Sequence, residues 1–143
     1  MRGWFAVGVW HPKTAENIGT LVRSAHAFGA SFVFTVGRRY KRQASAVKLD
    51  RHIPVLHFAT LDDLRTAMPK GARIVGVELD DRSVPLREFT HPPAAAYLLG
   101  AEDHGISSHI RPGMQLVQIE GGSSCLNVAT AGSIVMYDRV VRS

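Results

Sequence analysis

Three short segments of the sequence combine glycines with polar side chains of the kind that bind ligands or position a nucleophile. They occupy residues 11–23, 98–107 and 117–128. The first holds Asn17 and Arg23, the second holds Glu102, and the third contains Asn127. An arginine can stabilise a developing oxyanion, and amide or carboxylate groups can orient it or its substrate. Taken singly, however, glycines usually make turns and Asn usually caps helices, so no one segment identifies a site.

The elements expected around these segments alternate between strands and helices. Short apolar runs predict strands over residues 4–10, 31–36, 55–58, 73–79, 94–99 and 115–119. Apolar residues at helical spacing predict helices over residues 16–28, 61–68 and 128–141. This alternation predicts an α/β fold with a mostly parallel sheet flanked by helices. Each of the three segments then follows a strand, at the sheet edge where ligand crevices form.

Composition is typical of one globular domain, which we expect to span residues 1–143. No run of the sequence approaches the roughly 18 apolar residues of a membrane-spanning helix. Cys125 is the only cysteine, which excludes an internal disulfide, and the N-terminal residues do not form a secretory signal pattern. We therefore expect a cytoplasmic protein in a reducing compartment.

Positive charge is concentrated in the first part of the chain. The formal net charge is +5, and residues 1–60 contain nine Lys or Arg side chains but only two acidic ones. Thirteen of the seventeen cations are arginine, whose planar guanidinium binds phosphates and stacks on bases. Four cations surround Tyr40: Arg38, Arg39, Lys41 and Arg42. This cluster predicts an RNA-binding loop, with a solvated basic surface as the alternative.

Two other kinds of site are not indicated by the sequence. His104 and His109 are five residues apart, which does not align two zinc ligands on one helix face, and we expect no metal. The turn after the first predicted strand, residues 11–14, has neither the G-x-G-x-x-G nor the G-K-[ST] pattern of nucleotide-binding loops.

Together the three segments resemble the three signature motifs of the SpoU (TrmH-like) branch of the SPOUT superfamily. These proteins are RNA ribose 2'-O-methyltransferases that use S-adenosylmethionine. The matching stretches are Asn17-x-Gly19-x-x-x-Arg23, Leu99-Gly100-x-Glu102-x-x-Gly105 and Cys125-Leu126-Asn127-Val128-x-x-Ala131. Two positions depart from the family pattern: Cys125 stands where serine is usual, and Val117-Gln118-Ile119 stands where an Ile-Pro-Met type of sequence is common.

The resemblance implies a C-terminal segment that threads through a loop to form a deep trefoil knot. The cofactor would lie in a pocket formed by three loops of that knot, and Gly100 would leave space for its adenosine. The cofactor-binding residues implied in this way are Val77, Glu78, Gly100, Val117, Ile119, Cys125, Leu126 and Asn127.

The resemblance also implies the catalytic residues, which are Arg23, Asn17 and Glu102. Because a guanidinium normally stays protonated, we expect Arg23 to orient the ribose hydroxyl and stabilise the alkoxide, with Asn17 and Glu102 orienting it. RNA would be bound by Arg23 and by the cluster Arg38, Arg39, Lys41 and Arg42.

The last predicted helix is apolar over more than one stripe of its surface, so it needs partners on two sides. The resemblance implies a homodimer built partly with this helix, and a tRNA substrate, as for other small members of the family. Two alternative functions stay open: methylation of an RNA base by a related knotted enzyme, and a non-catalytic RNA-binding module.

Overall fold

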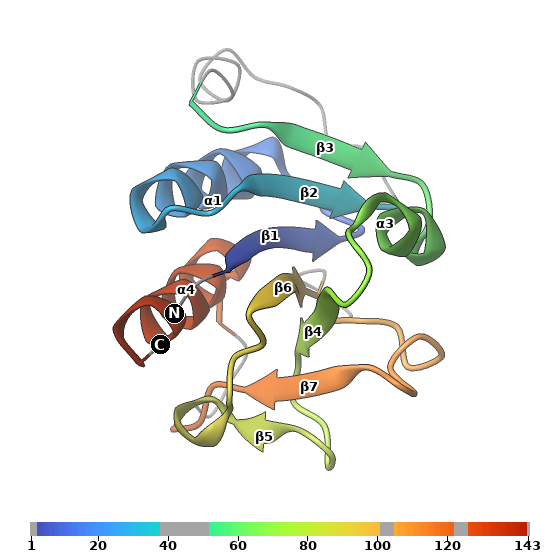
Figure 1. Cartoon of the computed structure of the whole chain (residues 1–143), viewed down its shortest axis with the longest axis vertical. Helices are drawn as coiled ribbons and strands as arrows, with labels where there is room; N and C mark the ends of the chain where they lie inside the picture. The colour runs from blue at the N-terminus through green and yellow to red at the C-terminus, as the bar shows by residue number, and fades with distance from the viewer. Residues whose placement is uncertain (1–2, 38–51, 101–104, 122–125, 143) are drawn as a thin grey trace.

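Figure 1 shows the computed structural model, which describes residues 3–37, 52–100, 105–121 and 126–142. The strands are β1 (Trp4–Trp10), β2 (Phe32–Val36), β3 (Val55–Phe58), β4 (Arg73–Val77), β5 (Val84–Pro85), β6 (Ala94–Leu99) and β7 (Gln115–Gln118). The helices are α1 (Ala15–Phe28), α3 (Leu61–Ala67) and α4 (Val128–Arg142), with a 3-10 turn η1 (Leu86–Glu88). The sequence predicted all of these except β5 and η1, because elements of two or three residues are too short to show a periodic pattern.

The strands form one seven-stranded sheet in the order β3-β2-β1-β6-β4-β7-β5. Every pair of neighbouring strands is parallel, which confirms the predicted α/β fold. The chain builds β2 and β3 on one side of β1, whereas β6 pairs with the other side of β1. Ligand crevices form outside the carboxyl ends of strands where the winding changes direction in this way. The predicted knot involves residues 101–104 and 122–125, which lie outside the described residues, so the knot stays a prediction.

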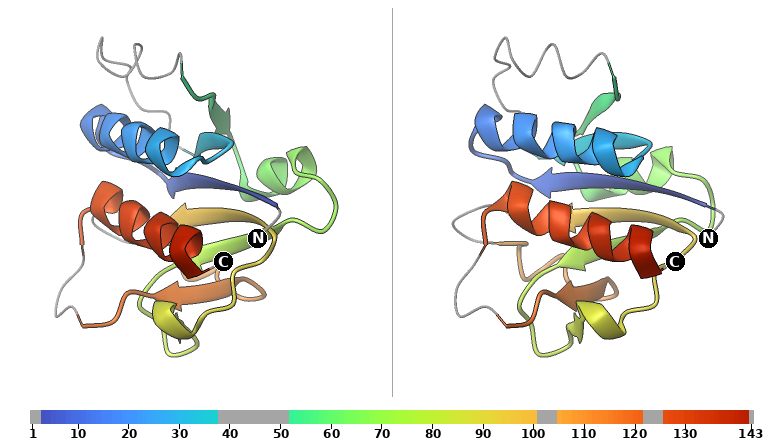
Figure 2. Two further views of the ribbon diagram at one scale, coloured as in Figure 1. Left: turned by 60° about the vertical axis from the view of Figure 1, so that its left-hand side comes forward. Right: turned by 90° about the vertical axis from the view of Figure 1, so that its left-hand side faces the viewer.

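Helices cover both faces of this sheet. α1 and α4 lie side by side on one face, and α3 lies on the other (Figure 2). In the core under α1 and α4, Leu21 and Val135 are both fully buried. A Cβ atom on Gly132 would lie 2.6 Å from Leu21 Cδ1, so glycine allows the two helices to pack this closely. The hydroxyl of Ser133 on α4 donates to that of Ser24 on α1 at 2.8 Å.

At the amino edge of the sheet, the buried Arg139 of α4 binds the backbone at the starts of β1 and β6. Its guanidinium donates to the carbonyl oxygens of Pro92 at 2.7 Å, Pro93 at 2.9 Å and Trp4 at 3.3 Å. It also lies 5.1 Å from the centroid of the Phe5 ring. These contacts fix the C-terminal helix to the first strand.

His91 completes a buried polar network beside this arginine. Its Nε2 lies 2.7 Å from the Asp138 carboxylate and its Nδ1 lies 2.7 Å from the Tyr97 hydroxyl. A carboxylate only accepts, so Nε2 carries the hydrogen and Nδ1 accepts from Tyr97. Burial lowers the pKa of His91 and outweighs the opposing hydrogen bond to Asp138. Burial raises the pKa of Asp138, but hydrogen bonds from Arg142 and His91 outweigh it and leave that pKa lowered.

Candidate active site

The first and third sequence segments meet at the carboxyl edge of the sheet through two asparagines. Asn127 Nδ2 donates to Asn17 Oδ1 at 2.9 Å, although 110 residues separate them. The sequence predicted roles for both residues but not this contact. The hydrogen bond joins the start of α1 to the start of α4.

Asn127 also caps α4. Its Oδ1 accepts from the backbone N–H groups of Ala129 at 2.9 Å and Thr130 at 3.2 Å. Thr14 caps α1 in the same manner, accepting from Asn17 N at 3.4 Å. Both helix N-termini therefore lie at one end of the molecule (Figure 2). Because the positive ends of two helix dipoles are close together there, this edge favours an anionic group.

Glu78, at the end of β4, holds the second segment in place. Its Oε2 accepts from Ile106 N at 2.7 Å, and its Oε1 accepts from Leu79 N at 3.0 Å. The backbone N–H of Glu78 donates to the Val117 carbonyl at 2.9 Å. The sequence predicted Glu78 as a cofactor contact, whereas in the structure both carboxylate oxygens bind the protein itself.

Arg111 reinforces the same loop, and the sequence did not single it out. Its Nε donates to the Ile106 carbonyl at 2.8 Å, and its terminal nitrogens lie 3.5 Å from Glu78 Oε2 and 3.4 Å from Asp80 Oδ2. The hydrogen bond from Arg82 N, together with Arg111, holds the pKa of Asp80 below its usual value, against the effect of burial. A lone arginine in a loop carries no sequence signal for such a role.

Gly100 is required by a close approach of the backbone. A Cβ atom there would lie 2.5 Å from Cα of Gly105 and 2.6 Å from Ile106 N. This close approach alone requires a glycine, and the predicted space for an adenosine stays a prediction. The chain returns on itself so tightly that no side chain fits.

The remaining predicted cofactor residues differ in exposure. Val77 and Ile119 are half-buried, Leu126 is 44% exposed, and Val117 is fully buried, so only the backbone of Val117 could reach a ligand. Leu79, which the sequence did not single out, is 53% exposed at the same edge. Exposed leucines can cover a flat apolar ring, such as the adenine of S-adenosylmethionine.

Arg23 lies apart from the asparagine pair. It follows Asn17 by six residues, which is about 9 Å along the helix and on a different face. It is exposed and makes no ion pair or hydrogen bond with the described residues. Among the described residues Arg23 therefore forms no hydrogen bond with Asn17 or Asn127, and its predicted role stays a prediction.

His11 directly follows the end of β1, and the sequence gave it no role. It has a positive φ of 49°, and its N–H donates to the Val36 carbonyl at 2.8 Å. Side chains with a Cβ rarely adopt this conformation, which is often kept near functional sites. Nothing in the sequence could reveal it.

Several predicted residues lie outside the described residues: Glu102, Cys125, Arg38, Arg39, Lys41 and Arg42. Their roles stay predictions. In the described part of the chain, no group of three or more His, Cys, Asp or Glu could hold a metal ion. Within the same residues, no helix is both long and apolar enough to cross a bilayer.

A family model described as the SpoU rRNA Methylase family matches residues 5–137. No curated protein matches the sequence at a significant level. Among solved structures, an AdoMet-bound rRNA methyltransferase from Sinorhizobium meliloti is 25% identical with a TM-score of 0.82, and the match covers all of this chain and 59% of that one. This chain therefore spans about three fifths of the length of that protein.

Two further structures share the fold over most of their own length. One, described as giving insight into the 2-OH methylation of C/U34 on tRNA, is 21% identical with a TM-score of 0.80, covering 100% of this chain and 94% of that one. The other is a TrmH/SpoU tRNA modifying enzyme from A. aeolicus, 20% identical with a TM-score of 0.81, covering 96% and 74%.

Proposed function

The chain belongs to the SpoU rRNA Methylase family, and on that premise we propose that it methylates a ribose 2'-oxygen in RNA, with tRNA as the substrate. The observation that carries this proposal is the hydrogen bond between Asn17 and Asn127, which joins the first and third motifs at the carboxyl edge of the sheet. The solved structure described as giving insight into the 2-OH methylation of C/U34 on tRNA shares this fold, which supports tRNA as the substrate.

S-adenosylmethionine would supply an electrophilic methyl group on a sulfonium sulfur. Leu79, Ile119 and Leu126 would cover its adenine, with backbone groups of residues 119–121 reading the ring edge. Glu78 and Arg111 would act indirectly, by fixing the loop that begins at Gly105. The asparagine pair would hold the two helix starts in position around the reacting groups.

Arg23 would act on the RNA. A ribose hydroxyl is a weak nucleophile near neutral pH, and its oxygen gains negative charge as it attacks. The exposed guanidinium of Arg23 makes no ion pair with the described residues, so it is available to hold that oxygen and a neighbouring phosphate. It would stabilise the alkoxide by charge, because an arginine rarely gives up its own proton.

The proposal includes a homodimer formed through α4. Tyr137, Val140 and Val141 of this helix are 57%, 48% and 55% exposed, next to a face already packed on the sheet. A second copy would cover this apolar surface and could bring its Arg23 close to a neighbouring crevice. Arg23 lies apart from the asparagine pair in one chain, which is consistent with a site completed by two chains.

The test uses the intact protein with labelled S-adenosylmethionine and unfractionated tRNA, followed by digestion to nucleosides. We expect a 2'-O-methylated nucleoside, and Arg23→Ala should lower kcat by about 100-fold or more while the cofactor affinity changes little. Arg23→Lys is the matched control for charge. It should recover little of the activity lost in Arg23→Ala, since the ammonium group of lysine lacks the two-pronged geometry of a guanidinium.

Other outcomes would contradict the proposal in different ways. Label on a base would identify a base methyltransferase. Binding of tRNA without any transfer would identify a non-catalytic module. Full activity of Arg23→Ala would remove the role given to that arginine. Activity on ribosomal RNA but not on tRNA would show that the proposed substrate is wrong.

A further inference from the structure

A basic groove lies at the opposite edge of the sheet from the candidate active site. It forms where α3 ends and where β4 and β7 begin, whereas the active site lies at the carboxyl ends of those strands. Its volume is about 530 Å³. We define the basic groove by its three cations, Arg65, Lys70 and Arg73. No family motif and no part of the arginine-rich first sixty residues contributes to it.

The charge of the basic groove is unusual for its place in the sequence. Residues 61–143 contain more acidic than basic side chains, yet three of their cations occur within residues 65–73. Among the described residues that line the groove, none is acidic. Lys70 and Arg73 are exposed and pair with no carboxylate in the described part of the chain. Two of the three groove cations therefore lack a carboxylate partner among the described residues.

Arg65 does have a carboxylate partner, but a weak one. Its guanidinium lies 3.2 Å from Asp62, and the two side chains are 49% and 89% exposed. An ion pair as exposed as this contributes little to stability. Arg65 can therefore exchange Asp62 for a phosphate at small cost.

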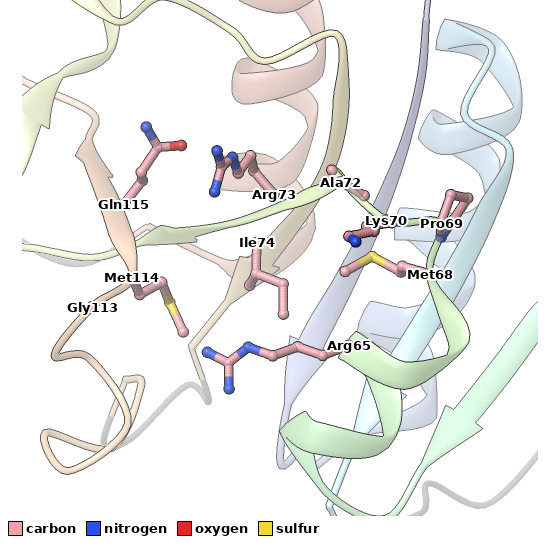
Figure 3. A pocket seen from close by; sticks show the side chains of 11 residues that line it. Arg65, Met68, Pro69, Lys70, Ala72, Arg73, Ile74, Gly113, Met114 and Gln115 are labelled. Carbon is pink, nitrogen blue, oxygen red and sulfur yellow. The ribbon is translucent and has the colours of Figure 1, made fainter.

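The arrangement of the groove fits a polymer better than a single small anion. Figure 3 shows the guanidinium groups of Arg65 and Arg73 on either side of Ile74, so they do not converge on one point. Met68, which is half-buried, lines the groove, whereas Ile74 and Met114 beneath it are only 9% and 6% exposed. Separated cations match the successive phosphates of a polynucleotide, and Met68 can contact its sugars.

We propose that the basic groove binds the sugar-phosphate backbone of the RNA at a distance from the methylated ribose. This inference rests on the proposed function, because it needs an RNA substrate. The five residues of β4 separate the groove from the active site by about 17 Å. Only an RNA large enough to reach both ends of the strand gains affinity from both, so the groove would favour a folded RNA over a short fragment.

The experiment measures tRNA binding by intact Lys70→Gln/Arg73→Gln protein as a function of salt concentration. We expect the dissociation constant to rise by about tenfold and the slope of log K against log salt to fall by about two, one for each lost phosphate contact. Thermal unfolding and binding of S-adenosylmethionine should stay unchanged, because both side chains are exposed and far from the crevice. Arg73→Gln alone should reduce the slope by about one.

Arg87→Gln is the matched control, since it removes one 74% exposed cation that pairs with Glu120 outside the groove. It should change tRNA affinity by less than about twofold. If the groove variants bind tRNA as this control does, and the protein methylates tRNA normally, the inference that the groove binds RNA is wrong but the proposed function stands. Micromolar binding of inorganic phosphate that the same variants abolish would make the groove a small-anion site and also overturn the inference. A wild-type protein that neither binds nor methylates tRNA would instead defeat the proposed function itself.

Discussion

Glu78 was predicted as a cofactor contact, and the structure shows what its carboxylate does within the protein. Its two oxygens accept from Leu79 N and Ile106 N, and Oε2 faces Arg111. The carboxylate therefore helps to fix the position of the loop, and its contact with a cofactor stays a prediction. A substitution at Glu78 should be read as a change in loop position before it is read as a lost ligand contact.

Gly100→Ala should disrupt the loop between Gly100 and Gly105 directly. The new Cβ would lie 2.5 Å from the Gly105 backbone, which cannot move aside as a flexible side chain can. We expect the free energy of unfolding to fall by about 1–3 kcal/mol, with a loss of cofactor binding. Denaturant unfolding and calorimetry with S-adenosylmethionine measure the two effects.

Gly19→Ala provides the control, because Gly19 is also a motif glycine but a Cβ there would have no atom within 4 Å. In a helix this change should raise stability by up to about 1 kcal/mol. Equal stability losses in the two variants would show that the tight approach at Gly100 is not the cause.

The helix α4 has one face buried in the core and another face exposed. Val135 is fully buried, whereas Val140 is 48% exposed, although both belong to the same apolar pattern in the sequence. A sequence pattern shows how much of a helix must be covered, but it does not show which side the protein's own sheet covers.

Val140→Asp should therefore weaken self-association without unfolding the chain. A carboxylate in an apolar interface should lower the association constant by about 100-fold, or about 2–3 kcal/mol. Light scattering combined with circular dichroism measures the mass and the fold together. Val135→Asp should unfold the protein, and a wild-type monomer at micromolar concentration would contradict the dimer.

The sequence predicted the long elements because each has a clear apolar pattern and a recognisable end. It also predicted that segments near residues 17 and 127 would contribute to one site. It could not reveal the Asn17 to Asn127 hydrogen bond, the conformation of His11 or the contacts of Arg111, because each depends on how distant segments pack. Arg139 shows the same limit: it was one basic residue in an apolar helix, and it is buried against three carbonyl oxygens.

The buried network around His91 should make the free energy of unfolding of the protein depend on pH. An ordinary histidine titrates near 6.5, and burial lowers the pKa of His91 in the folded protein. Above pH 6.5 neither the folded nor the unfolded protein binds this proton, so His91 does not lower the free energy of unfolding. As the pH falls below 6.5, the unfolded chain gains a proton that the folded chain does not, and stability decreases.

Melting temperatures between about pH 7 and pH 5 measure this effect. His91→Gln should lose about 1–3 kcal/mol of stability near neutral pH, since it leaves buried partners unsatisfied, and should show a flatter decline with acid. An identical decline in both proteins would assign the effect to other groups.

The pairing of β1 with β6, and of α1 with α4, also has a consequence during synthesis on the ribosome. β1 and α1 are made before their partners, because one neighbour of β1 begins at residue 94 and Arg139, which binds the carbonyl of Trp4, is made later still. At 5–20 residues per second, the apolar side of β1 waits roughly 5–25 seconds for its partners. Nascent chains of this protein should therefore need chaperones to shield β1 until Arg139 has been made.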